Sequence, residues 1–134
     1  MKIVLDTNVL ISGFLTPGIS RNVLGHVLGQ KFCILSPYIL DEFRSKLVSD
    51  KFRFPEGVVQ SFVTHLESHA SVIAEEAHPG IQCPDPADRK ILALCMTVKA
   101  DLLITGDKEL LNMNSIAATP IINPSQYWKF IQTP

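Results

Sequence analysis

The sequence has few cysteines, no long apolar segment and almost no net charge, and each shortage excludes a class of protein. The three cysteines, Cys33, Cys83 and Cys95, are scattered and form no CxxC pair, which argues against a disulfide framework and favours free thiols in a reducing compartment. No apolar run approaches the roughly 20 residues that span a membrane. The N-terminus also lacks a basic segment followed by a long apolar one. We therefore expect a cytoplasmic protein with no membrane partner.

The composition that is present is that of a folded domain. Hydrophobic residues make up 46% of the 134 residues and charged residues 19%, which is enough for one well-packed core and argues against disorder. The formal net charge is −1, so bulk charge alone indicates no nucleic-acid partner, although a local basic patch is compatible with it. We expect a single domain over residues 1–134.

Short apolar runs alternate with amphipathic segments along the chain. The predicted strands are residues 3–5, 32–35, 72–73, 101–105 and 120–122. The predicted helices are residues 9–15, 20–28, 36–47, 54–68, 85–99, 108–111 and 123–131. Strands that alternate with helices predict a three-layer α/β/α sandwich with a mostly parallel sheet of about five strands.

The first and fourth predicted strands each end in an acidic residue, Asp6 and Asp107. The carboxyl ends of parallel strands share one edge of an α/β sheet, which is where such sheets bind ligands. If the two strands are neighbours, Asp6 and Asp107 converge at that edge. Glu42, Asp85 and Asp88 lie in early turns of predicted helices and are expected near the same edge.

Carboxylates gathered at one edge repel one another, and a divalent cation relieves the repulsion. Oxygen-only ligands favour Mg²⁺ or Mn²⁺ over zinc, and such a site supports in-line attack of water on a phosphodiester. Each acid also has an ordinary role open to it, because Asp6, Asp85 and Asp107 can cap helices and Glu42 can be a solvated helix residue. These roles do not explain why two strands end in an acid at the same edge.

Four blocks of the sequence, in this order and spacing, resemble the PIN-domain family. They are residues 3–12 (Ile-Val-Leu-Asp-Thr-Asn onward), 36–42 (Ser-Pro to Glu), 84–91 (Pro-Asp-Pro-Ala-Asp-Arg-Lys-Ile) and 104–108 (Ile-Thr-Gly-Asp-Lys). The likeness covers nearly the whole chain and extends to prokaryotic PIN-domain toxins of the VapC type. It implies a PIN-like fold and a metal-dependent endoribonuclease that hydrolyses RNA phosphodiester bonds, acting as the toxin of a toxin–antitoxin pair.

The resemblance assigns the catalytic and metal-binding roles to four acids, Asp6, Glu42, Asp88 and Asp107. We expect Mg²⁺ or Mn²⁺ to be held chiefly by Asp6 and Asp88. Asp107 and Glu42 would contact the ion directly or through water.

Further residues are assigned supporting roles by the same resemblance. Asn8 and Thr105 match polar residues that orient the ligands, and Asp85 matches an additional acid. Ser12 is a candidate for the same pocket, although a serine at a helix start is more often a cap. The family's acidic run before the third block's lysine is denser than the run in this chain, which leaves open how Asp85 and Asp88 share the metal.

Three basic residues adjoin the acids, and we expect Arg89, Lys90 and Lys108 to hold RNA phosphates. Other basic residues, Lys46 among them, are interpreted as ordinary helix-surface charge. The resemblance also implies an antitoxin protein as partner and a homodimer.

Alternative functions make different demands on the sequence. A catalytically weakened PIN-fold module that binds RNA or protein is the main alternative, and the intact set of four acids argues against it. A phosphatase of the haloacid type requires a second aspartate where Asn8 stands. A phospho-receiver requires a lysine on the last strand, which Ile121 and Ile122 do not supply.

Overall fold

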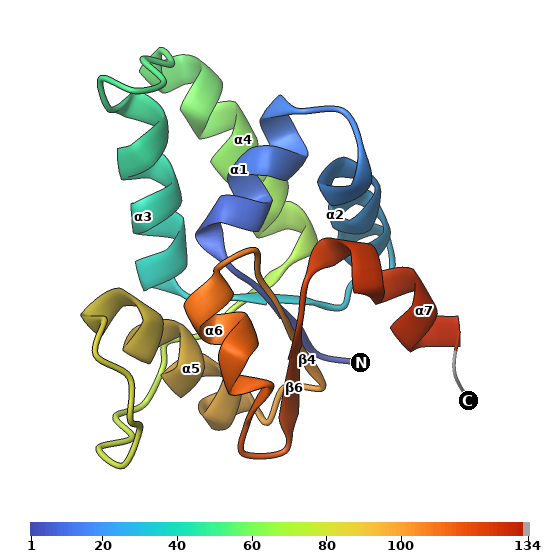
Figure 1. Ribbon diagram of the computed structural model, residues 1–134. Coiled ribbons are helices and arrows are strands. Elements are labelled where there is room, and N and C mark those ends of the chain that lie inside the picture. The colour runs from blue at the N-terminus through green and yellow to red at the C-terminus, as the bar shows by residue number, and fades with distance from the viewer. Residues whose placement is uncertain (133–134) are drawn as a thin grey trace.

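The computed structural model describes residues 1–132 and is a three-layer α/β/α sandwich (Figure 1). Its strands are β1 (Ile3–Leu5), β2 (Cys33–Leu35), β3 (Ser71–Val72), β4 (Leu102–Ile104), β5 (Ser115–Ile116) and β6 (Thr119–Ile122). They form one six-stranded sheet in the order β3-β2-β1-β4-β6-β5, parallel except for the β5–β6 pair. The predicted fold class is confirmed.

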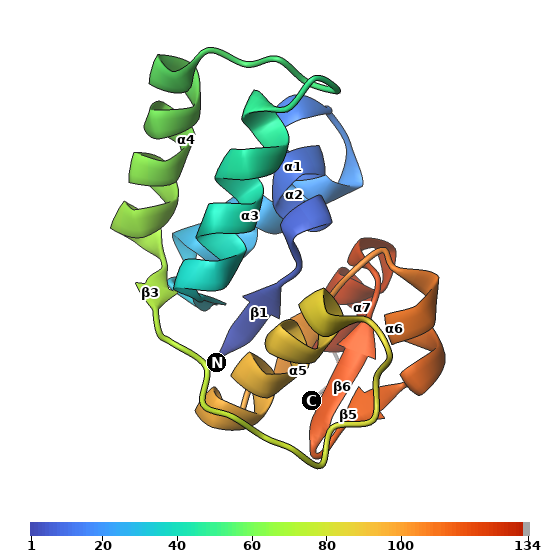
Figure 2. The same ribbon diagram turned by 90° about the vertical axis from the view of Figure 1, so that its left-hand side faces the viewer.

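Helices lie on both sides of the sheet and beyond its carboxyl edge. They are α1 (Thr7–Leu15), α2 (Ile19–Gly29), α3 (Pro37–Val48), α4 (Glu56–His69), α5 (Pro86–Val98), α6 (Lys108–Met113), the 3₁₀ helix η1 (Pro124–Gln126) and α7 (Tyr127–Gln132). Helix α5 lies on one side of the sheet and α2 and α7 on the other, while α1, α3 and α4 form the upper half of the molecule (Figures 1 and 2).

The three central strands are buried on both faces, which is why they read as continuous apolar runs in the sequence. Every residue of β1, β2 and β4 is buried. Strand β1 pairs with β2 on one side and with β4 on the other, and Leu5 lies opposite Ile104 in the parallel register. The last residues of β1 and β4 therefore end side by side, as the sequence predicted.

Most element boundaries differ from the sequence-based ones by one or two residues, and two differences go further. Helix α2 begins at Ile19 with Gly18 as its N-cap, so Ser20 is not the cap. The strand β5 was not predicted, because it is two residues long and its turn lacks the glycine or asparagine that marks most tight hairpins. Ala117 supplies the positive φ of that turn instead, at 51°.

Helices α1 and α2 pack against each other closely because Gly13 has no side chain. A Cβ atom at Gly13 would lie 2.6 Å from Leu24 Cδ2, 3.1 Å from Leu24 Cβ and 3.3 Å from the carbonyl oxygen of Ser20. Leu24 is itself buried. The position of α1, which carries the residues that follow Asp6, is thus fixed by contact with α2.

The helices of the described residues include none with the length and apolar character needed to cross a membrane.

Replacing Gly13 with alanine should destabilise the fold, since a well-packed core resists an added methyl group. We expect the free energy of unfolding to fall by about 1–3 kcal/mol, measured by urea denaturation. The control is Gly25→Ala in α2, where a Cβ would meet nothing within 4 Å. That variant should be more stable by roughly 0.5–1 kcal/mol, since alanine is the better helix former. A Gly13→Ala protein as stable as Gly25→Ala would refute the close contact.

Candidate active site

A single threonine hydroxyl connects the ends of β1 and β4. The Thr105 Oγ1 hydroxyl donates a hydrogen bond of 2.7 Å to Asp6 Oδ2 and accepts one of 3.0 Å from the backbone N–H of Asp107. The backbone N–H of Asp6 in turn donates to the carbonyl of Ile104, at 3.0 Å. Asp6 and Thr105 are buried. The predicted convergence of the two strand ends at one edge is present.

Helix α5 presents two acids that have different surroundings. Asp85 is the exposed N-cap, and its Oδ1 accepts a hydrogen bond of 2.8 Å from the backbone N–H of Ala87. Asp88, in the first turn, is only 7% exposed, and its Oδ2 has no hydrogen-bond partner among residues 1–132. Asp85 therefore takes the structural role that its sequence context allowed, whereas Asp88 is buried without a partner for that oxygen.

The acids affect one another's protonation, which places them in one electrostatic cluster. Burial, together with the negative charges of Asp107, Asp85 and Asp6 and a side-chain interaction with Asp107, raises the pKa of Asp88 to about 6. Burial also raises the pKa of Asp6, and the charge of Glu42 adds to the increase, while the hydrogen bond from Thr105 opposes it. In the charged state these carboxylates repel one another across a partly dehydrated edge.

Two residues that the sequence did not single out contact the site from α3. The Tyr38 hydroxyl donates a 3.3 Å hydrogen bond to Glu42 Oε2, and Lys46 Nζ lies 3.9 Å from Glu42 Oε1. The Lys46 ammonium also donates to Asn8 Oδ1 at 3.2 Å, so it links α3 to α1. Both residues are four positions from Glu42 on the helix, and this spacing is the signal that could have identified them.

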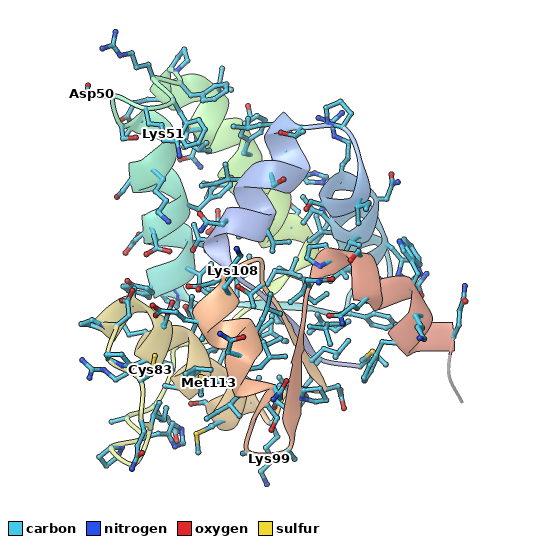
Figure 3. The ribbon with its side chains drawn as sticks, viewed as in Figure 1. Asp50, Lys51, Cys83, Lys99, Lys108 and Met113 are labelled. Atoms are coloured by element: carbon cyan, nitrogen blue, oxygen red, sulfur yellow. The ribbon has the colours of Figure 1, made fainter. Side chains whose placement is uncertain are left out.

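The remaining predicted residues lie around this cluster. Arg89, Lys90 and Lys108 are exposed, and Figure 3 shows Lys108 at the start of α6. Lys90 Nζ lies 4.7 Å from the centre of the Tyr38 ring, so it crosses from α5 to α3. Ser12 is half-buried in α1, and its role stays a prediction.

The donor atoms at this edge fit a hard divalent ion, although they are not gathered around a point. Among residues 1–132, no group of three or more His, Cys, Asp and Glu side chains has the arrangement of a metal site. Asp85 and Asp107 each turn Oδ1 toward a helix N–H, which leaves each a second carboxylate oxygen. The buried, unpartnered Oδ2 of Asp88 is the atom that most needs a cation.

Comparisons with known proteins lead to a family. A family model of the PIN domain matches residues 2–109. The uncharacterized protein MJ1680 of Methanocaldococcus jannaschii is 32% identical over 118 residues, which cover 84% of this chain and 75% of that protein. A chain in the crystal structure of VapBC2 from Rickettsia felis, bound to a DNA fragment from their promoter, has a similar fold. Its TM-score is 0.66 at 18% identity, and the match covers 92% of this chain and 98% of that one.

Fold and site together define an α/β domain with a carboxylate centre at the carboxyl edge of its sheet. Because the family match spans most of the sequence, the chain belongs to the PIN-domain family. PIN domains are generally nucleases, and these nucleases generally use divalent metal ions.

Replacing Asp88 with asparagine should stabilise the metal-free protein at neutral pH. The folded-state pKa of Asp88, about 6, is higher than the unfolded value of about 3.9. The folded protein therefore binds this proton more tightly, and its stability falls as the pH rises through that interval. Above about pH 7, Asp88→Asn should be more stable than the parent by up to about 3 kcal/mol, and the gain should vanish near pH 4.

Urea unfolding in EDTA across this pH range measures the effect. The control is Asp41→Asn, an exposed position on α3, which should show no such gain. If Asp88→Asn is no more stable than the parent at about pH 8, the Asp88 charge carries no cost in the folded state.

Proposed function

We propose that this protein is a metal-dependent endoribonuclease that hydrolyses RNA phosphodiester bonds. The observation that carries the proposal is the buried Oδ2 of Asp88, which lacks a partner and lies in the field of Asp6, Asp85 and Asp107. A buried carboxylate held near other carboxylates is unfavourable in the free protein and becomes favourable once a cation is present. Membership of a family of nucleases supports the same conclusion.

Asp6, Asp88 and Asp107 would hold the ion, with Glu42 contacting it directly or through water. Mg²⁺ or Mn²⁺ bound there activates water and neutralises charge on the phosphate, which is the chemistry that hydrolysis needs. Thr105 fixes the orientation of the Asp6 carboxylate by its hydrogen bond. Asp85 adds negative charge from the end of α5 while it caps that helix.

Polar and basic residues around the acids would position the substrate. The side-chain oxygen of Asn8 accepts a hydrogen bond from Lys46, which would orient the amide. Arg89, Lys90 and Lys108 are exposed cations that follow Asp88 and Asp107 directly in the sequence, and they would bind RNA phosphates. Ser12 would line the same pocket from α1.

We further propose that the protein is the toxin of a toxin–antitoxin pair in the cytoplasm, with a cognate antitoxin as partner and a homodimer as its assembly. The likeness of its fold to a chain of the VapBC2 structure supports this role.

Removing a proposed metal ligand should abolish cleavage. Asp6→Asn and Asp88→Asn should each lower the rate of Mg²⁺- or Mn²⁺-dependent RNA cleavage by at least about a hundredfold, because even residues behind the ligands contribute 10–100-fold. The measurement uses a mixed pool of structured RNA, with EDTA as a blank and calorimetric titration of Mn²⁺ in parallel. Asp41→Asn should cleave at the parent rate.

The outcomes separate catalysis from binding. Loss of cleavage in Asp88→Asn, in a protein that is more stable than the parent without metal, would exclude misfolding as the cause. Absence of both cleavage and Mn²⁺ binding in the parent protein would overturn the nuclease and favour the RNA- or protein-binding module. Mn²⁺ binding without cleavage would show that the RNA pool lacks the specific substrate.

Replacing Thr105 with valine should weaken metal binding while keeping the shape of the side chain. The Asp6 carboxylate loses its fixed orientation, so the affinity for Mn²⁺ should fall about 10- to 100-fold in calorimetry. Thr119→Val is a matched control, since Thr119 is also buried and its hydroxyl donates to the carbonyl of Ala100, at 2.7 Å. Equal affinities in the two variants would contradict the role of Thr105.

A further inference from the structure

A cavity of about 390 Å³ lies on the outer face of α5, between this helix and the stretch of residues 75–81 that follows β3. From the helix it is lined by Pro86, Arg89, Lys90 and Ala93, whose spacing places them on one face. Figure 2 shows the long segment between β3 and α5 passing along this helix. The volume is in the range of small-molecule sites.

The far wall of the cavity is held in place by one residue of α5. Thr97 Oγ1 donates to the carbonyl of Ala93 at 2.8 Å, so it can only accept from other groups. It accepts from the backbone N–H of Glu76 at 2.9 Å and from His78 Nε2 at 3.2 Å. The cavity is therefore preformed, because Thr97 holds the segment on one side of it to helix α5 on the other side.

An acidic oxygen without a partner lies in this wall. Glu75 lines the cavity as a half-buried side chain, and one of its carboxylate oxygens, Oε1, is buried with no hydrogen-bond partner in the described part of the chain. A buried carboxylate oxygen without a donor costs free energy and calls for one. The cations of Arg89 and Lys90 border the same cavity from α5, so it has a carboxylate on one wall and positive charge on the other.

The cavity is connected to the acidic edge through a short chain of contacts. Lys90, which borders the cavity, lies over the ring of Tyr38, and the Tyr38 hydroxyl donates to Glu42. Asp88 lies on the opposite face of the same helix, about one helix diameter, ~10 Å, away. The cavity and the acidic edge therefore lie on two sides of one helix and are linked through Lys90 and Tyr38.

We propose that the cavity binds one nucleotide of the RNA, with its phosphate on Arg89 and Lys90 and an amino-bearing base on Glu75. The proposal rests on the proposed function, since the ligand is part of the same substrate. A carboxylate accepts a hydrogen bond from the exocyclic amino group of cytosine. Uracil presents a carbonyl oxygen at that position, which the carboxylate repels. RNA-binding proteins read unstacked bases in this way, on their Watson–Crick edges. Glu75 thus determines substrate specificity.

The test measures the binding of CMP and of UMP to the protein in EDTA. Calorimetry gives the affinities, and changes in amide chemical shifts locate the bound nucleotide. CMP should bind about tenfold more tightly than UMP, and the shifts should be confined to residues 75–81 and 86–93. Glu75→Leu keeps the volume of the side chain and should bind the two nucleotides equally. Glu67→Leu, an exposed position on α4, should retain the preference.

Further variants distinguish the role of the basic wall of the cavity from that of Glu75. Arg89→Ala should lower the affinities for CMP and UMP by the same factor, because contacts with the phosphate do not distinguish one base from another. Urea unfolding should show Glu75→Leu to be folded and no less stable than the parent, as expected when a buried carboxylate oxygen without a partner is removed.

Three results would overturn the proposal: equal affinities of CMP and UMP in the parent protein, a preference that survives in Glu75→Leu, or no binding of either nucleotide. These results leave the proposed nuclease untouched, because the assay contains no metal and follows no cleavage. Conversely, cytosine-selective binding in a protein that cleaves no RNA would refute the nuclease alone.

Discussion

The Thr105 hydroxyl is the contact on which the acidic edge depends. It accepts from the Asp107 backbone and donates to the Asp6 carboxylate, so two strands that are distant in the sequence present their acids in a fixed relation. The parallel pairing of β1 with β4 brings these residues together, but pairing alone would leave the Asp6 side chain free to rotate. A buried carboxylate that accepts a hydrogen bond from a buried hydroxyl keeps one orientation. Asp88 belongs to α5 and Glu42 to α3, so the remaining two acids come from helices.

The electrostatics of the site oppose the stability of the fold. Burial and mutual repulsion raise the pKa of Asp6 and Asp88, so the folded chain without a cation carries a cost at neutral pH. Lys46 relieves part of it, since its ammonium lies near Glu42 and its charge lowers the pKa of Asp6. Sites that bind cations commonly accept such a cost in the free protein, because it is returned when the ion binds.

The sequence predicts the centre of this fold well and its periphery less well, for physical reasons. Buried parallel strands must be apolar on both faces, so β1 and β4 and the acids that end them are visible in the sequence. Asp85 and Pro86 likewise mark the start of α5. The spacing of Lys46 from Glu42 marks it as a possible partner of that acid, but its contact with Asn8 on another helix could not be predicted from the sequence.

Glu75 illustrates the same limit more strongly than Lys46 does. It lies in a segment without periodicity. The partial burial of its side chain depends on the path of the chain around α5, to which Thr97 ties the neighbouring backbone. Strand β5 could not be predicted, because two residues are too few to show an alternating pattern. Contacts between side chains from different elements are set by tertiary packing, which local patterns do not encode.

The two outermost strands of the sheet, β3 and β5, are each only two residues long. An edge strand exposes unpaired N–H and C=O groups, and a long one invites a strand from another molecule. With so few groups available on either side, this sheet offers no template for edge-to-edge growth. Association between copies of this protein would therefore use the surfaces of its helices, and the sheet itself is protected against the polymerisation that open β-structure permits.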